Sequence, residues 1–310
     1  MSQRELRTMT YASQDKIARI TLNRPKRGNS ITFEMPQELA ACVERANLDP
    51  SVHVIALSGN GKGFCGGYDL GHAEDPSQVD YAEEGRSQLP PGSPLDPKIV
   101  LENHDSKRTW DPMLDYAMMS RNLRGFMSLF HSDKPVVVKI HGFCVGGGSD
   151  MALCADLLVV EDDAKIGYPP ARVWGCPTSA MWIHRIGVER TKRLLFTGDC
   201  LSGKEAAEWG LAVESAPANQ LDDRFEALLT RIARLPVNQL MMMKMLTNQA
   251  LLAQGLLQRQ TLATVFDGIT RHTAEGYAFS ERAREVGFRQ AVRERDQAFG
   301  DAGPSTYKGG

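Results

Sequence analysis

The sequence predicts an α/β core followed by a helical region, and three observations support this fold class. Strand-like and helical patterns alternate up to residue 202. Two apolar runs, at 54–57 and 135–140, each lead into a glycine-rich turn, GFCGGYDL at 63–70 and HGFCVGGGSD at 141–150. From residue 203 onward, apolar side chains recur at helical spacing. We therefore divide the chain into a core at 1–202, a helical region at 203–299 and a tail at 300–310 that we expect to be disordered.

In the first part of the core, the sequence pattern predicts one helix between two strands. Residues 16–22 alternate in polarity and are rich in β-branched side chains, which favours a strand. A basic turn follows at 23–29. Residues 32–48 have helical spacing that ends at Asp49-Pro50, and 52–57 predict the next strand.

Residues 71–111 change the character of the chain. Most of this stretch is rich in Asp, Glu, Ser, Pro and Gly and has almost no apolar period. We expect a long loop or lid, because a loop of this length within a compact domain is usually functional or disordered. Helical spacing resumes at 112–131, and Lys134-Pro135 separates that helix from the strand at 135–140.

The remaining elements follow the second glycine-rich turn. A short helix at 150–155 leads to strands at 157–160 and 164–167. The C-terminal region then predicts six helices, at 204–209, 221–235, 237–254, 256–270, 274–286 and 288–298.

The composition argues against several classes of function, including nucleic-acid binding, membrane binding and metal chemistry. The 310 residues are 42% hydrophobic and 24% charged, and the net charge of −2 gives no long-range field that would attract nucleic acid or an anionic membrane. The N-terminal residues lack the apolar core of a signal peptide, and no run is long enough to span a bilayer. The six cysteines form no CxxC pair and the seven histidines no HxH or HExxH pair, so we expect reduced thiols, no metal and a cytoplasmic protein.

The two glycine-rich turns point to catalysis. Glycines at the end of a strand allow a tight turn that leaves backbone N–H groups bare. Two such turns can direct one N–H each at a single oxygen and so stabilise charge that develops on a carbonyl. The alternative is that the glycines serve only tight turns and close packing. Residues 61–66 also fit the GxGxxG dinucleotide pattern, but a polar, proline-containing stretch follows where that site needs a helix, so we disfavour it.

Several landmarks occur together in one order: ITLNRP at 20–25, the two turns, AD at 155–156, AKIG at 164–167, FTG at 196–198 and EA…GLA at 205–212. In this the chain resembles the crotonase (enoyl-CoA hydratase/isomerase) superfamily over residues 15–300. The resemblance implies a core that is a spiral of ββα repeats and a C-terminal helical region that forms trimers. It also implies an acyl-CoA substrate, no cofactor beyond the coenzyme A of that substrate, and a homotrimer or a dimer of trimers.

The resemblance also assigns roles to residues. The oxyanion donors fall on the backbone N–H groups of Tyr68 and Gly147, and the basic pair Lys26 and Arg27 falls where relatives contact coenzyme A. Asp150 occupies the position of a catalytic glutamate, although an aspartate there also suits a helix N-terminus. Residues that we expect to contact substrate are Cys65, Gly66, Asp69, Leu70, Gly146, Tyr168, Pro170 and Arg172. We expect Asp69 to order its loop through backbone hydrogen bonds.

One family feature is absent from the sequence. The second glutamate of hydratases falls on Pro170, or on Ala171 if the alignment shifts by one, and neither side chain can titrate. Hydration by two glutamates is therefore in doubt. Tyr168 and Arg172 could replace the glutamate, or they could only shape the pocket. A single carboxylate suits an isomerase, and hydrolysis of a CoA thioester or a β-dicarbonyl is an alternative. A third alternative is an acyl-CoA-binding protein without catalysis.

Overall fold

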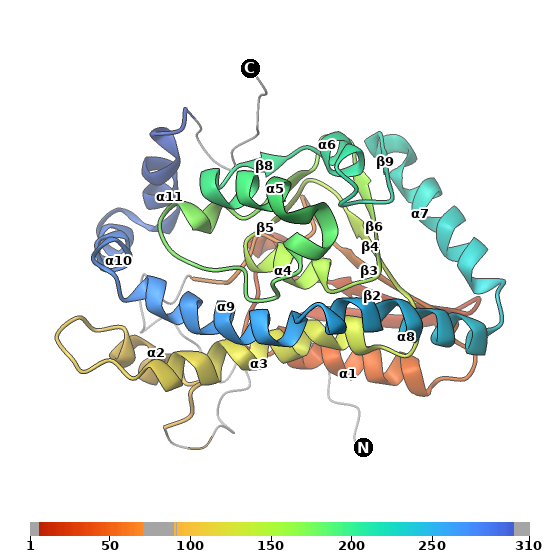
Figure 1. Cartoon of the computed structure of the whole chain (residues 1–310), viewed down its shortest axis with the longest axis horizontal. Coiled ribbons are helices and arrows are strands. Elements are labelled where there is room, and N and C mark those ends of the chain that lie inside the picture. The colour runs from red at the N-terminus through yellow and green to blue at the C-terminus, as the bar shows by residue number, and fades with distance from the viewer. Residues whose placement is uncertain (1–5, 71–89, 91, 301–310) are drawn as a thin grey trace.

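The computed structural model describes residues 6–70, 90 and 92–300, and it contains two sheets surrounded by helices (Figure 1). The larger sheet has six strands in the order β1-β2-β3-β4-β6-β9. Their bounds are β1 Met9–Gln14, β2 Ile17–Leu22, β3 Val54–Gly59, β4 Val136–Ile140, β6 Leu157–Glu161 and β9 Glu214–Ala216. β1 pairs antiparallel with β2, and every other pair in this sheet is parallel.

A smaller sheet contains β5 (Phe143–Val145), β7 (Lys165–Gly167) and β8 (Cys200–Leu201). It is tied to the first glycine-rich turn by an isolated bridge between Cys65 and Cys144. The two glycine-rich turns are therefore held together by backbone pairing, although nearly eighty residues separate them in the sequence.

Helices cover both faces of the larger sheet. The α-helices are α1 Met35–Leu48, α2 Pro97–Asn103, α3 Pro112–His131, α4 Gly147–Leu153, α5 Trp182–Thr197, α6 Gly203–Glu208, α7 Ala218–Ala233, α8 Val237–Ala253, α9 Leu256–Arg271, α10 Ala274–Val286 and α11 Phe288–Gln297. Two short 3₁₀ helices are η1 (Pro25–Arg27) and η5 (Pro169–Arg172).

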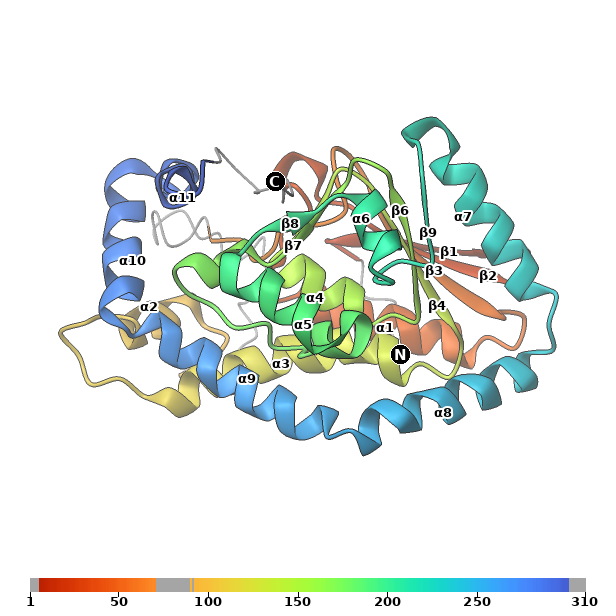
Figure 2. The ribbon, with the colours of Figure 1, turned by 45° about the horizontal axis from the view of Figure 1, so that its top comes forward.

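Alternation along the parallel strands separates two hydrophobic clusters. On β3, Val54 and Ala56 point toward α7, where they pack with Leu221 and Phe225. The intervening strand residues join the main core beneath α1, α3 and α4. Figures 1 and 2 both show α7 alone on its side of the sheet, while α8 and α9 run beside α3 on the other side.

Most of the predicted elements are present within a few residues of their expected bounds. The short strands β5, β8 and β9 were not predicted, and three longer elements differ as well. β1 was not predicted, because it is an edge strand whose residues after Met9 are mostly exposed and show no alternation. α5 was not predicted, because Gly187 breaks its helical geometry with φ of 75° and interrupts the apolar period.

The third difference is a correction to the expected loop at 71–111, since α2 lies within it. Asp96 caps α2 by accepting from the Lys98 N–H, and Pro97 occupies the first helical position, where its missing N–H is not needed. Residues 71–89 and 91 of the predicted loop or lid lie outside the described residues, as does the predicted tail from residue 301 on. Among the helices that are described, none is both long and apolar enough to cross a membrane.

Candidate active site

The two glycine-rich turns meet edge to edge. The Val145 N–H donates to the Cys65 carbonyl at 3.1 Å, and the Phe64 N–H donates to the Phe143 carbonyl at 2.9 Å. Gly67 has φ of 95°, which an L-residue rarely adopts, and a Cβ atom there would lie 3.2 Å from the Val145 carbonyl oxygen. Glycine is thus required at this point both by conformation and by the close approach of the second turn.

The backbone around Tyr68 is held by the pairing of its neighbours with Ile31. The Ile31 N–H donates to the Gly67 carbonyl at 2.8 Å, and the Asp69 N–H donates to the Ile31 carbonyl at 2.9 Å. Since successive N–H groups of an extended segment point to opposite sides, the Tyr68 N–H points away from Ile31. The site that a Cβ of Gly67 would occupy is only 3.5 Å from the Gly147 nitrogen.

Neither the Tyr68 N–H nor the Gly147 N–H donates to another group within the described ranges 6–70, 90 and 92–300. Both residues line a cavity of about 290 Å³. Buried N–H groups are nearly always paired, so two bare amides on one cavity wall are a ready site for an oxygen atom of a ligand.

The cavity is lined by residues from most of the chain. The predicted site residues in its lining are Gly66, Tyr68, Asp69, Leu70, Gly146, Gly147, Tyr168 and Pro170. Apolar side chains of α2, α3 and α11 form much of the remaining wall, among them Leu101, Met118, Met119, Phe288 and Val292. Five other predicted site residues do not belong to its described lining: Lys26, Arg27, Cys65, Asp150 and Arg172.

Two of these five serve the fold. The Cys65 thiol is fully buried and donates to the Asn29 carbonyl at 3.1 Å, and burial raises its pKa to about 12. The Arg172 side chain is 1% exposed and forms ion pairs with Asp199 and Asp296, each at 3.1 Å. Backbone pairing thus holds Cys65 and buried carboxylates hold Arg172, and substrate contact by these two residues stays a prediction.

The basic pair Lys26 and Arg27 and the aspartate of the first glycine-rich turn, Asp69, differ in their surroundings. Lys26 and Arg27 are exposed on η1. The Asp69 N–H donates to the Ile31 carbonyl, and its carboxylate forms an ion pair with Arg24 at 2.9 Å and accepts from the Ser30 hydroxyl at 3.1 Å.

Asp150 lies on α4 and is completely buried. Its Oδ1 accepts from the Ser179 hydroxyl at 2.6 Å and from the Ser179 N–H at 3.1 Å, whereas its Oδ2 has no hydrogen-bond partner among the described residues. Burial raises the pKa of this carboxyl to about 7. Asp150 is thus only three residues from Gly147 in the sequence, but it is outside the described lining of the cavity.

Pro170, where the second glutamate was expected, packs against the second turn. A Cβ atom on Gly146 would lie 3.4 Å from Pro170 Cγ. On the other side of the same proline, a Cβ atom on Gly175 would lie 3.2 Å from Pro170 Cβ. An apolar ring thus fills this position, and it offers no proton donor or acceptor.

Sequence reasoning missed a group of charged residues from α9. Asp267 lines the cavity, and its Oδ1 accepts from the Cys176 N–H at 3.1 Å while its Oδ2 lies 3.2 Å from Arg271 Nη2. The same nitrogen of Arg271 lies 3.6 Å from Asp115. No motif marks these residues, and the only signal is the four-residue spacing of Asp267 and Arg271, which places them on one face of the predicted helix at 256–270.

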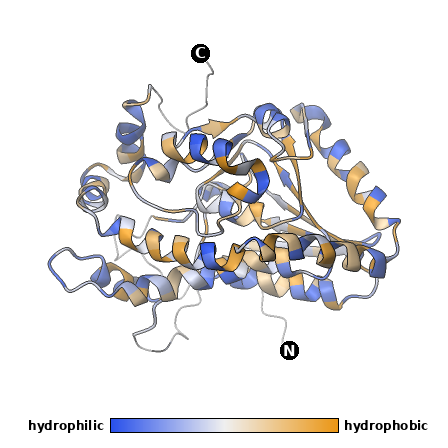
Figure 3. Ribbon diagram, viewed as in Figure 1, coloured by the Kyte–Doolittle hydropathy of each residue, from blue (hydrophilic) through white to orange (hydrophobic). Residues whose placement is uncertain are grey.

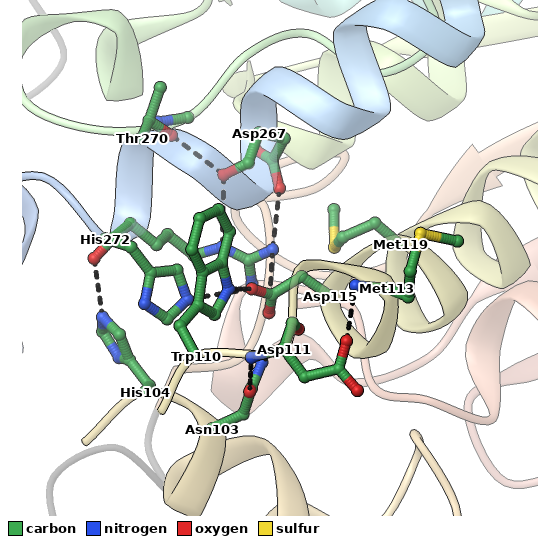
Figure 4. A network of polar contacts seen from close by, with 12 residues as sticks. Asn103, His104, Trp110, Asp111, Met113, Asp115, Met119, Asp267, Thr270 and His272 are labelled. Atoms are coloured by element: carbon green, nitrogen blue, oxygen red, sulfur yellow. Dashed lines mark hydrogen bonds and ion pairs between the residues drawn. The ribbon is translucent and has the colours of Figure 1, made fainter. Parts of the chain in front are cut away.

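Asp115 is the centre of this polar network (Figure 4). Its Oδ2 accepts from Trp110 Nε1 at 2.7 Å and lies 2.8 Å from His272 Nε2. His104 also lines the cavity, and its Nε2 donates to the Arg271 carbonyl at 2.9 Å. Burial lowers the pKa of His104 to about 4, so its ring is neutral near pH 7.

Comparisons with known proteins agree with this fold. The family model described as enoyl-CoA hydratase/isomerase matches residues 12–89 and 109–290. A putative enoyl-CoA hydratase of Mycobacterium tuberculosis, EchA13, is 30% identical over 262 residues, which cover 81% of this chain and 77% of that protein. A putative enoyl-CoA hydratase of Thermus thermophilus is 26% identical, with 86% and 94% covered. The crystal structure of an enoyl-CoA hydratase from Mycobacterium smegmatis is 54% identical, covers 98% of both chains and has a TM-score of 0.90.

Proposed function

Because the chain belongs to the enoyl-CoA hydratase/isomerase family, we propose that it holds the enolate of an acyl-CoA thioester between the N–H groups of Tyr68 and Gly147. The observation that carries this proposal is that these two amides line one cavity and donate to no acceptor within the described part of the chain. Removal of a proton beside the thioester moves negative charge onto its carbonyl oxygen. Two fixed donors stabilise that charge without having to reorganise, and loss of one such donor lowers the rate by about 10²–10³.

Proton transfer between two carbons of the acyl chain is the reaction that this cavity favours. Addition of water by two carboxylates needs a second titratable group beside the first, and Pro170 supplies none. An isomerase needs one group that takes a proton from one carbon and returns it to another. Hydrolysis of the thioester or of a β-dicarbonyl would need an activated water as a second reactant, and it is the alternative reaction.

Three acyl-CoA substrates distinguish these reactions. With a β,γ-enoyl-CoA, an isomerase makes the conjugated α,β-enoyl thioester and the enoyl absorbance rises. With crotonyl-CoA, a hydratase removes that absorbance. With a β-keto acyl-CoA, a hydrolase releases a thiol or a new carboxylate. We expect the first result, and tight binding without turnover of any of the three would contradict catalysis.

We further propose that α8 and α9 associate with other copies of the chain as a homotrimer or a dimer of trimers. Large apolar side chains are exposed along these helices: Met242, Met243, Met245 and Leu246 on α8, and Leu257, Leu262, Val265, Phe266 and Ile269 on α9. Figure 3 shows hydrophobic residues recurring along both helices. An apolar surface of this extent on a globular protein marks an interaction site. Sedimentation velocity should therefore find a mass of three or six chains.

A further inference from the structure

The proposed reaction needs a group inside the cavity that can take and return a proton. Among the described residues, the carboxylates that line the cavity are Asp69, Asp267 and Asp296. Asp69 is held by Arg24 and Ser30 at the loop, as described above. Asp296 is fully buried and is enclosed by Arg172 at 3.1 Å and Arg295 at 2.8 Å. Asp296 is thus enclosed by two ion pairs, one with each guanidinium group.

Asp267 differs from both of these carboxylates in its position. A Cβ atom on Gly175 would lie 3.7 Å from Asp267 Oδ1 and 3.3 Å from the Tyr168 hydroxyl oxygen. The same Cβ would lie 3.2 Å from Pro170, whose ring reaches the Gly146 turn on its other side. Asp267 is therefore separated from the oxyanion turn by the ring of the residue that occupies the position of the missing glutamate.

We propose that Asp267 is the catalytic acid and base of this cavity, and that α9 thus supplies in space the carboxylate that the sequence lacks at position 170. The inference rests on the proposed function. The Asp267 carboxylate takes the proton from the α-carbon, and the C–H electron pair becomes the new carbon–carbon π bond as the thioester carbonyl electrons move onto its oxygen. The Asp267 carboxylic acid then returns the proton to the γ-carbon, the π electrons of the dienolate form that C–H bond, and the carbonyl is restored. No other reactant is consumed.

The surroundings of Asp267 allow both protonation states. Burial raises the pKa of its carboxyl, and Asp115 on α3 acts in the same direction. Arg271 on the same helix lowers that pKa, as does the bond from the Cys176 N–H. The charge of Asp267 also raises the pKa of three nearby groups, which are Asp150 on α4, Tyr168 and Cys176. Because Arg271 is shared with Asp115, its charge is not fully committed to Asp267.

Asp150 is the rival for this role, and its position argues against it. Both hydrogen bonds from Ser179 fall on Oδ1 and leave Oδ2 without a partner among the described residues, but the carboxyl is fully buried outside the described lining of the cavity. A general base must lie within hydrogen-bond reach of the proton that it abstracts. Asp267 lines the cavity and Asp150 is outside its described lining, so we assign the role to Asp267.

Parallel Asn variants test this assignment. We expect Asp267→Asn to lower kcat for the β,γ-enoyl-CoA by about 10²–10⁴, the usual contribution of a general base, while its Kd for a saturated acyl-CoA stays near that of the parent. Asp156→Asn is the matched control, because Asp156 is a partly buried carboxylate that pairs with Lys244 at 2.8 Å and lies away from the cavity. We expect that variant to lose stability and to keep its kcat. The inference is overturned if Asp267→Asn keeps the parent kcat, or if Asp150→Asn alone removes turnover.

A second measurement covers the case in which Asp267→Asn does not fold. Arg271→Gln removes the cation that lowers the Asp267 pKa, and no effect of Arg271 is found at Asp150. The acidic limb of kcat/KM against pH should therefore move to higher pH in Arg271→Gln if Asp267 is the base. An unmoved limb would overturn the assignment. Failure of the proposed function is distinguishable, because then the parent enzyme itself would turn over no acyl-CoA.

Discussion

Replacement of Gly147 by alanine tests the two-amide site most directly. A Cβ atom there would lie 2.7 Å from Tyr68 Cε2 and 3.0 Å from Ile31 Cδ1. Ordinary contact between carbon atoms begins near 3.4 Å, so the turn or the Tyr68 ring has to move by roughly 0.7 Å. Such a shift would lengthen an N–H···O bond of about 2.9 Å beyond the hydrogen-bonding range.

The expected effect follows from the loss of one donor. Displacement of a reacting group by about 1 Å lowers rates about 10²-fold, and loss of an oxyanion donor lowers kcat by about 10²–10³. We therefore expect Gly147→Ala to lower kcat for a β,γ-enoyl-CoA by about 10² or more. The assay is the rise in conjugated-enoyl absorbance under saturating substrate, with circular dichroism to establish that the variant is folded.

A remote glycine provides the control for steric damage alone. Gly125 on α3 packs against α1, and a Cβ atom there would lie 2.4 Å from Pro36 Cβ. We expect Gly125→Ala to lower the free energy of unfolding while the kcat of the folded enzyme is kept. The reasoning is refuted if folded Gly147→Ala has the kcat of the parent, or if Gly125→Ala loses kcat to the same degree.

Three further predictions concern other parts of the molecule. Burial raises the Asp150 pKa from 3.8 to about 7, so the folded state keeps a proton that the unfolded chain releases. The resulting contribution to the free energy of unfolding is present in full below about pH 4. It is lost as the pH rises to about 7, and the loss amounts to a few kcal/mol. Asp150→Asn should flatten that dependence in urea denaturation at pH 5 and pH 8, and an unchanged slope would contradict the buried, raised carboxyl. Lys26→Ala with Arg27→Ala should raise KM for acyl-CoA several-fold with little change in kcat, and the effect should shrink at high salt because exposed charge contacts are screened; an unchanged KM at low salt would exclude these residues from coenzyme A binding. Leu246→Lys with Phe266→Lys should shift the sedimentation coefficient toward that of a single chain, and an unchanged coefficient would mean that another surface joins the copies.

The sequence predicted the family, the fold class and much of the cavity because these depend on local patterns. Gly67 and Gly146 have positive φ, and a Cβ atom on Gly147 or Gly148 would lie within 2.7 Å of a neighbouring atom. These positions need glycine for local reasons, so the glycine pattern can be recognised in the sequence. The amphipathic spacing at 112–131 predicted α3 at its observed bounds, because one face of that helix is buried along its whole length.

The residues that sequence reasoning missed are those whose role depends on distant partners. Asp267 and Arg271 have ordinary helical spacing, and only the packing of α9 against α3 brings them to the cavity and to Asp115. Asp150 was placed by its neighbour Gly147, but its contact with Ser179 lies 29 residues away and could not be anticipated from spacing. Arg172 was predicted in the pocket, and its ion pair with Asp296 spans 124 residues. Long-range pairing of charged groups leaves no local signal.

The cavity wall runs from Ile31 near the start of the chain to Asp296 near its end. The two amides belong to residues 68 and 147, whereas part of the wall around them comes from α9 and α11. A variant truncated before α9 would therefore keep both glycine-rich turns and lack this part of the wall.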